Sequence, residues 1–233
     1  MDPLSTAQAN TEKNLQNARA LFESHLQSVF TRRGKGWAER RLGEISFFSS
    51  GGTPSKRKSH YWSGRIPWVS GRDMKSTRLS DTALHISEAA VEGSETRIAP
   101  AGTLLVLVRG MGLAHGAQIA ELLVPCAFNQ DIRAVHPAVG IVPRFLLFAL
   151  RTQINHCENV VSNAAHGTLK INMDDLQKLS ITLPSQKEQE WIAQQIDALA
   201  AETQRLARLY EQKQSALAAL KKALLHQAFS GEL

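Results

Sequence analysis

The chain has 233 residues, of which 43% are hydrophobic and 21% charged, a composition typical of a globular protein with a hydrophobic core. Its 27 Lys and Arg residues outnumber its 21 Asp and Glu residues, which gives a formal net charge of +6. The apolar runs are too short to span a bilayer and the N-terminus is too polar for a secretory signal, so we expect a cytoplasmic protein. Two cysteines cannot form a disulfide framework, and no CxxC pair indicates a zinc site.

The N-terminal segment predicts one amphipathic helix, which we assign to residues 1–34. Residues 5–31 contain neither Pro nor Gly. Apolar residues recur there at three- and four-residue steps and define one face: Leu15, Ala18, Phe22, Leu26 and Val29. Gly34 and Gly36 end the segment.

The middle of the chain, residues 35–184, predicts a compact α+β domain with a mostly antiparallel β-sheet. It holds most of the glycines and prolines, and short β-rich runs alternate there with turn signals. We expect strands at 66–70, 104–109, 131–135 and 179–183, and helices at 87–92 and 143–154.

The C-terminal zone, residues 185–233, predicts one long coiled-coil helix. Ser185 and Glu188 have the spacing of a capping box, and no Pro or Gly follows until Gly231. A heptad stripe supplies the residues that we expect to pack helices or form a dimer: Ile192, Ile196, Leu199, Leu206, Tyr210, Leu217, Leu220 and Leu224.

The C-terminal helix is predicted to be much longer than the N-terminal one. At 1.5 Å per residue it would measure roughly 65 Å, and roughly 27 Å of it would overhang the first helix. We expect a partner chain or a missing segment to cover this overhang, and two copies to associate antiparallel. Packing of the stripe against the chain's own globular domain is the alternative.

The two helices also resemble each other. Placing Phe30 on Phe229 aligns four further pairs of identical residues: Glu12 with Glu211, Ala20 with Ala219, Leu21 with Leu220, and Leu26 with Leu225. Read as an internal repeat, the end of the chain is similar to the segment that leads into the globular domain.

The positive charge is concentrated in one part of the chain. Between Arg32 and Arg78 there are twelve Lys and Arg residues and three acidic ones, Glu39, Glu44 and Asp73. Such a patch is typical of proteins that bind a phosphate backbone, although a solvated basic loop has the same composition.

Three short segments supply candidate DNA contacts. The turn at 49–55 is rich in Gly and Ser and precedes Lys56, Arg57 and Lys58, so its amides and cations could approach a phosphate. Arg72, Lys75 and Arg109 follow predicted strands, where an arginine can reach a guanine; pairing of Arg72 and Asp73 with neighbours is the alternative. The aromatic residues nearby, Tyr61, Trp62 and Trp68, are expected to anchor the core or loops rather than to stack on bases.

Sequence motifs for catalysis are missing. There is no P-loop, GxSxG or HExxH motif, the tetrapeptide of adenine methyltransferases is absent, and the histidines do not have metal-ligand spacing. The glycines at 110–116 have the wrong spacing for a dinucleotide loop. A stand-alone nuclease or methyltransferase is therefore improbable.

The chain resembles the specificity subunit of Type I restriction-modification systems. The stretches that carry the resemblance are WAERRLGEI (37–45), GGTPS (51–55), IPWVSGRDM (66–74), FNQD (128–131), the block from GTLKIN (167–172) to LPSQKEQEWI (183–192), and AFSGEL (228–233). Members of that family usually contain two target-recognition domains separated by long helices. This chain has one such domain, so it looks like a half-length subunit that dimerises or like half of a longer protein.

The resemblance implies a non-catalytic subunit. Its recognition domain would read one half of a split target in double-stranded DNA, and its helices would set the spacing between halves. They would also dock methylation subunits and, in the restriction complex, a restriction subunit. S-adenosylmethionine, ATP and magnesium would belong to those partners, and this chain would bind no cofactor or metal.

Carried over to this sequence, the resemblance gives a set of expected DNA contacts. Backbone contacts are expected from Gly52, Thr53, Lys56, Arg57, Lys58, Gly167, Thr168 and Lys170. Contacts to bases or grooves are expected from Arg72, Lys75 and Arg109. Phe128 and Asn129 are expected mainly to stabilise the domain. The alternative function is a coiled-coil scaffold whose basic region binds an acidic protein.

Overall fold

The structure, a computed structural model, describes residues 3–32, 34, 36–156, 160–163 and 168–230. It divides into two compact units. One contains residues 1–32 and 194–233, and the other contains residues 33–193. None of the helices in the described residues is long and apolar enough to cross a membrane.

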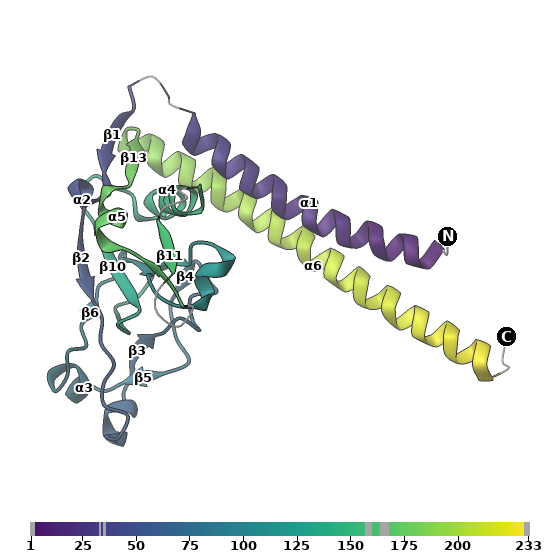
Figure 1. Ribbon diagram of the computed structural model, residues 1–233, viewed down its shortest axis with the longest axis horizontal. Helices are drawn as coiled ribbons and strands as arrows, with labels where there is room; N and C mark the ends of the chain where they lie inside the picture. The colour runs from purple at the N-terminus through teal and green to yellow at the C-terminus, as the bar shows by residue number, and fades with distance from the viewer. Residues whose placement is uncertain (1–2, 33, 35, 157–159, 164–167, 231–233) are drawn as a thin grey trace. The chain divides into compact units, whose positions relative to one another are not determined.

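The first unit is an antiparallel pair of helices, α1 (Pro3–Thr31) and the greater part of α6 (Gln186–Ser230) (Figure 1). Arg19 of α1 forms an ion pair with Glu211 of α6, with 3.2 Å between Nη2 and Oε1. The predicted face of α1 is confirmed, because Phe22 and Leu26 are buried and Leu15, Ala18 and Val29 are half-buried.

The expected overhang at the free end of α6 is confirmed in part. Figure 1 shows α6 continuing past the start of α1, and the described side chains after Lys221 are all exposed. The overhang is shorter than expected, because residues 186–193 of α6 belong to the other unit. There the Ser185 hydroxyl accepts a hydrogen bond from the Glu188 N–H, and the Gln189 side chain bonds the backbone of Val142 and Pro184.

The second unit is the α+β domain, and its sheets are mostly antiparallel, as predicted. The five-stranded sheet has the order β2 (Ser46–Ser50), β10 (Ile132–Pro137), β7 (Leu104–Leu107), β8 (Ile119–Leu122) and β4 (Arg78–Leu79). The four-stranded sheet has the order β5 (His85–Ile86), β3 (Ile66–Val69), β9 (Cys126–Phe128) and β6 (Ile98–Ala99). Only β4–β8 and β3–β9 are parallel among the described pairs.

Two smaller sheets complete the domain. The strands by which the chain enters and leaves it, β1 (Ala38–Arg41) and β13 (Ser180–Leu183), pair antiparallel. The hairpin of β11 (Val161–Asn163) and β12 (Leu169–Ile171) forms the other. The remaining short helices are α2 (Leu42–Ile45), α3 (Glu88–Glu92), α5 (Met173–Lys178), and the 3-10 turns η1 (Ser59–Trp62) and η2 (Met111–His115).

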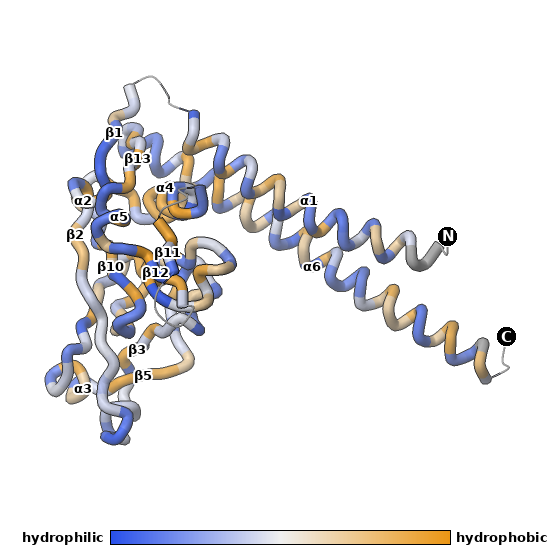
Figure 2. Tube along the Cα trace, in the orientation of Figure 1, coloured by the Kyte–Doolittle hydropathy of each residue, from blue (hydrophilic) through white to orange (hydrophobic). Residues whose placement is uncertain are grey.

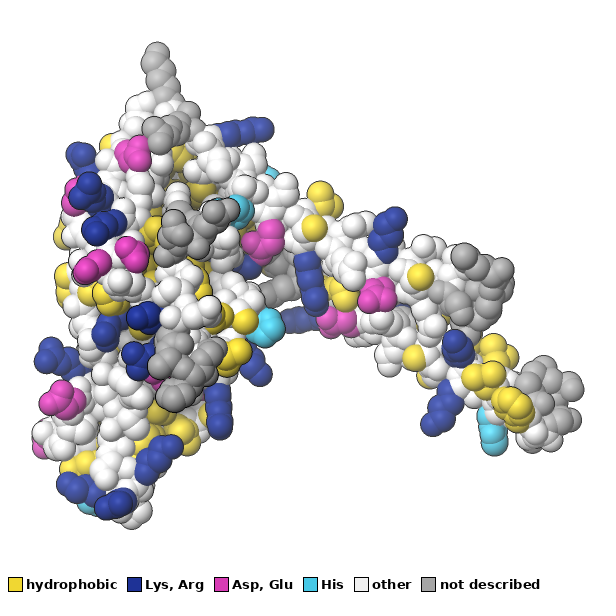
Figure 3. Space-filling view, in the orientation of Figure 1, with side chains coloured by type: hydrophobic (Ala, Val, Ile, Leu, Met, Phe, Trp, Pro, Cys, Tyr) yellow, Lys and Arg dark blue, Asp and Glu magenta, His cyan; other side chains and the backbone are white. Residues whose placement is uncertain are grey.

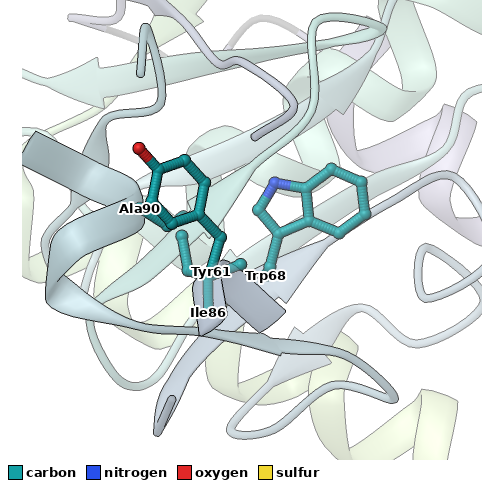
Figure 4. Packing of buried hydrophobic residues seen from close by; sticks show 5 residues of the cluster. Tyr61, Trp68, Ile86 and Ala90 are labelled. Carbon is teal, nitrogen blue, oxygen red and sulfur yellow. The ribbon is translucent and has the colours of Figure 1, made fainter. Parts of the chain in front are cut away.

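The core follows the hydropathy of the sequence. The central strand β7 is buried along its whole length. Helix α4 (Pro143–His156) lies against β8 and β13 with Phe145–Leu150 buried, and Figure 2 shows hydrophobic residues in this helix. A second cluster gathers Tyr61, Trp68, Ile86 and Ala90 (Figure 4), and Trp62 packs against it. The prediction that these aromatic residues are anchors is confirmed.

Candidate nucleic-acid interface

Two loops of the domain together line two cavities. The loop at 70–77 follows β3, and the loop at 108–118 follows β7. The first cavity has about 350 Å³ and is lined by Ser70, Gly71, Arg72, Leu107, Arg109, Gly110, Met111, Gly112, Asn129 and Asp131. The second has about 190 Å³ and is lined by Met74, Lys75, Thr77, His115, Ala117, Gln118, Ile119, Arg151 and Asn155.

Asp73 fixes the shape of the 70–77 loop. Its Oδ2 accepts hydrogen bonds from the Ser70 N–H at 2.9 Å and the Ser70 hydroxyl at 2.8 Å, and its Oδ1 accepts one from the Ala83 N–H at 3.3 Å. The Asp73 carboxylate therefore stabilises the conformation of the loop rather than neutralising Arg72. Arg72 and Lys75 are left exposed on a turn whose geometry is set.

Arg144 secures the other end of this loop. Its guanidinium donates to the Thr77 carbonyl oxygen at 3.0 Å and to the Thr77 hydroxyl at 3.2 Å, and lies 4.6 Å from the centre of the Phe148 ring. A bidentate guanidinium is a rigid connection, so the end of the loop is fixed to α4.

Two glycines, Gly110 and Gly116, lie near the start and the end of the second loop, because the backbone has a positive φ at both positions. Gly110 and Gly116 have φ of 135° and 94°, a region that other residues rarely adopt. A side chain at Gly116 would also lie 3.0 Å from Asn155 Oδ1, which accepts a hydrogen bond from the Ala117 N–H at 2.7 Å. Between the two glycines, η2 presents Met111 with 63% of its surface exposed.

Arg109 and Lys170 lie opposite each other on neighbouring backbone segments. They form an isolated antiparallel bridge, flanked by the Gly110 N–H to Leu169 oxygen bond at 3.0 Å and the Ile171 N–H to Val108 oxygen bond at 2.8 Å. Both side chains are exposed. Like charges directly opposite are destabilising, and a bound anion would relieve the repulsion.

The first cavity also contains an acidic group that the sequence analysis did not select. Asp131 is half-buried, its Oδ2 accepts from the Asn129 amide at 3.3 Å, and no ion pair in the described residues joins it to Arg72 or Arg109. The cavity thus offers guanidinium donors beside a carboxylate acceptor. The signal was present in the sequence, because Asn129 and Asp131 directly follow the buried strand β9.

The Gly-rich turn at 49–55 serves mainly to pack the domain. A Cβ atom on Gly51 would lie 2.1 Å from the Phe128 carbonyl oxygen. The Gly52 N–H donates to that same oxygen and its carbonyl accepts from the Trp68 indole, so both backbone groups that were expected near a phosphate are used inside the domain. The Thr53 hydroxyl donates to the Gln130 side chain at 2.6 Å.

The remaining expected contacts lie in several places. Lys58 donates to the Tyr61 hydroxyl at 2.9 Å, whereas Lys56 and Arg57 are exposed. None of these three residues lines either cavity. Thr168 is half-buried, and Gly167 lies outside the described residues. The structure therefore brings together Arg72 with Arg109, and Arg109 with Lys170, and puts Lys75 in the other cavity.

Three observations concern metal-ligating and titratable side chains in the described residues. These residues contain no group of three or more His, Cys, Asp or Glu side chains that could hold a metal ion. Burial raises the pKa of Cys126 to about 11, so its thiol is protonated at neutral pH. Burial also lowers the pKa of His136, whose ring bonds the Ser49 and Thr103 hydroxyls and stacks on Phe47.

The residues predicted to pack α6 are covered only in part. Ile192 and Ile196 are buried, and Leu199, Leu206, Tyr210 and Leu217 are half-buried. Leu220 and Leu224 remain 49% and 42% exposed, so the described chain does not cover them, and their expected role in a dimer stays a prediction. Beyond Tyr210 the half-buried positions are Gln214, Leu217 and Lys221, because a straight helix of 3.6 residues per turn drifts away from a 3.5-residue repeat.

Comparison with known proteins identifies the family. The model of the Type I restriction modification DNA specificity domain matches residues 34–212. The chain is 28% identical over 193 residues to the Type I restriction enzyme EcoR124I/EcoR124II specificity subunit of Escherichia coli, covering 82% of this chain and 47% of that protein. It is 30% identical over 164 residues to the MjaIX specificity subunit of Methanocaldococcus jannaschii, covering 68% of this chain and 37% of that protein.

Solved structures show the same fold. A chain from the complex assembly of a type I R-M system matches with a TM-score of 0.81 at 21% identity, and the HsdS subunit from Thermoanaerobacter tengcongensis with a TM-score of 0.64 at 20% identity. Each match covers 100% of this chain and 57% or 56% of the other, so the chain spans about half the length of the proteins that it matches. The resemblance seen in the sequence is confirmed: the chain belongs to the family of Type I restriction modification DNA specificity domains.

Proposed function

We propose that this chain is a DNA-specificity subunit that reads one half of a bipartite target and positions the methylation subunits of a Type I restriction-modification complex. Its membership of the specificity-domain family supports this role, as do two specificity subunits to which it is similar. The observation that carries the proposal is the first cavity, where Arg72 and Arg109 lie with the carboxylate of Asp131, which forms no ion pair with either arginine among the described contacts.

That combination suits the edge of a base pair. An arginine can donate two hydrogen bonds to O6 and N7 of guanine, and a carboxylate can accept one from the amino group of cytosine. A site for a phosphate alone would gain nothing from a carboxylate, because two anions repel each other. Lys170, held opposite Arg109, would neutralise a phosphate beside the cavity.

The chain itself would act without catalysing a reaction. The proposed division of labour leaves S-adenosylmethionine, ATP and magnesium to the methylation and restriction subunits. The cavity residues of this chain are suited to hydrogen bonding with DNA, and the buried Cys126 thiol is not activated as a nucleophile.

The end of α6 supports a second copy as a further partner. In the repeat that aligns the two helices, Leu26 and Phe30 of α1 are 2% and 7% exposed, whereas Leu225 and Phe229 of α6 are 49% and 89% exposed. Figure 3 shows hydrophobic side chains gathered at this end of α6. An antiparallel homodimer would cover them and would pair two identical recognition domains.

A methylation map tests the proposed function. The chain is co-expressed with a methylation subunit of a Type I system in an unmethylated host, and modified adenines are located by sequencing. A new palindromic split motif supports both the DNA-reading role and the homodimer. An asymmetric motif would retain the DNA-reading role and contradict the homodimer. Failure of the assembled complex to protect any duplex sequence would contradict the role itself and favour the coiled-coil scaffold.

A further inference from the structure

The second cavity differs from the first in its chemistry. Lys75, His115 and Arg151 line it together with the side chains of Thr77, Gln118 and Asn155, and neither Asp nor Glu is among its lining residues. Its volume of about 190 Å³ lies below the range of roughly 300–1,000 Å³ of pockets for drug-sized ligands. It therefore suits one small anionic group.

The donors of this cavity are held in place by the surrounding structure. Asn155 Oδ1 accepts a hydrogen bond from the Ala117 N–H. This contact fixes the orientation of the amide and leaves its nitrogen as a donor for another partner. Arg144 holds Thr77, and buried Met74 anchors the backbone next to Lys75. Arg151 is half-buried in the middle of α4, so its cation belongs to the wall of the cavity rather than to a freely moving loop.

The same two loops line both cavities. Residues 70–72 and 110–112 face the first cavity, whereas residues 74–75, 77, 115 and 117–119 face the second. A ligand that occupied the second cavity would therefore fix both loops next to Arg72 and Arg109. A DNA strand provides a phosphate beside each base, and so can occupy both cavities at once.

We propose that the cavity of Lys75, His115 and Arg151 binds one phosphate of the DNA backbone and thereby sets the register of the base-contacting loops. This inference rests on the proposed function, since it takes the ligand to be DNA. The two cavities would then have different roles. The second would contribute affinity for DNA that is the same for every sequence, and the first would contribute discrimination between bases.

The salt dependence of DNA binding tests this assignment. The full chain, assembled with a methylation subunit, is titrated with its target duplex and with a scrambled duplex at several salt concentrations. Loss of one phosphate contact makes the negative slope of log K against log salt shallower, by about 0.9 for B-DNA. We expect this change for Lys75→Gln combined with Arg151→Gln, with equal loss of affinity for both duplexes. Lys178→Gln, which removes an exposed cation on α5 outside the cavity, should leave the slope unchanged.

Three results would overturn the assignment. The first is a double variant whose slope of log K against log salt equals that of the wild type. The second is a loss of affinity for the target duplex only, which would make the cavity a base-reading site. The third is saturable binding of inorganic phosphate with no change in the DNA slope, which would assign the cavity to a free anion. Lys75→Gln alone repeats the test if the double variant has a lower thermal midpoint, because Lys75 is exposed. Absence of sequence-dependent binding by the wild-type complex would instead contradict the proposed function.

Discussion

Apolar side chains are buried in the interior of the globular unit and exposed at the free end of α6. Phe128, Phe145 and Leu104 are fully buried, whereas Leu224 and Phe229 remain 42% and 89% exposed. The globular unit thus completes its own core, while the helix presents apolar surface that the described residues do not cover. We expect the apolar residues of the domain to determine folding and those at the end of α6 to determine assembly.

The same substitution in the two regions should separate these roles most clearly. Phe128→Ala removes a ring with 0% exposure and should lower the free energy of unfolding by about 3–5 kcal/mol. Phe229→Ala, at 89% exposure, should change it by less than about 0.5 kcal/mol. Urea denaturation measures both values, and similar losses at the two positions would contradict the distinction.

Glycine substitutions sharpen the description of the domain interior. Gly51→Ala places a Cβ 2.1 Å from the Phe128 carbonyl oxygen, so the backbone must shift, at a cost of about 1–3 kcal/mol. Gly43→Ala is the control, because it lies in α2 with its nearest neighbouring atom at 3.5 Å. The thermal midpoint should fall for Gly51→Ala only; an unchanged midpoint would show that the turn is not tightly packed against Phe128.

The proposed homodimer can be broken at the end of α6. Leu220→Glu with Leu224→Glu should raise the dimer dissociation constant, since burial of a leucine contributes about 1.5–3 kcal/mol and each 1.4 kcal/mol is tenfold. Unfolding of the chain should be little affected, because both leucines are nearly half exposed. Analytical ultracentrifugation gives the oligomeric state. A wild-type chain that stays monomeric at high concentration would contradict the homodimer.

The smallest expected effect is a pH dependence of the stability of the globular domain. Burial lowers the pKa of His136, so the folded domain holds a neutral ring while the unfolded chain takes up a proton near pH 6.5. Stability should therefore fall as the pH drops below about 6.5, down to the folded-state pKa. The thermal midpoint at about pH 7.5 and about pH 5.5 measures this change. His136→Gln should show a weaker dependence, and an equal dependence would exclude His136 as its cause.

Local patterns predicted the elements of the fold well. The periodicity of α1, the capped start of α6 and the strands around Ile66, Leu104 and Ile132 all follow from residues close together in the sequence. The register of the two helices does not, because it depends on contacts between positions far apart in the chain, such as the Arg19–Glu211 ion pair, and on the burial of Leu26 and Ile196. For the same reason the length of the overhang was predicted only in part, since residues 186–193 of α6 belong to the globular unit.

The candidate site was predicted less completely than the fold. Arg72 and Arg109 were selected because they follow strands, and they do line one cavity. Asp131 was not selected, although its place shortly after a buried strand was visible in the sequence. Arg151 was not selected, since only the folded domain brings α4 beside those loops. Gly52 was selected for its residue type, although its backbone groups are used inside the domain.

The most direct test of the central claim is the methylation motif of the assembled complex with Arg109→Ala, compared with that of the wild type. If the first cavity reads a base pair, the variant should keep the spacing of the motif and most of its positions. It should lose discrimination at one position of each half-site, by about 1–3 kcal/mol. A variant that methylates the wild-type motif with undiminished selectivity would contradict the account.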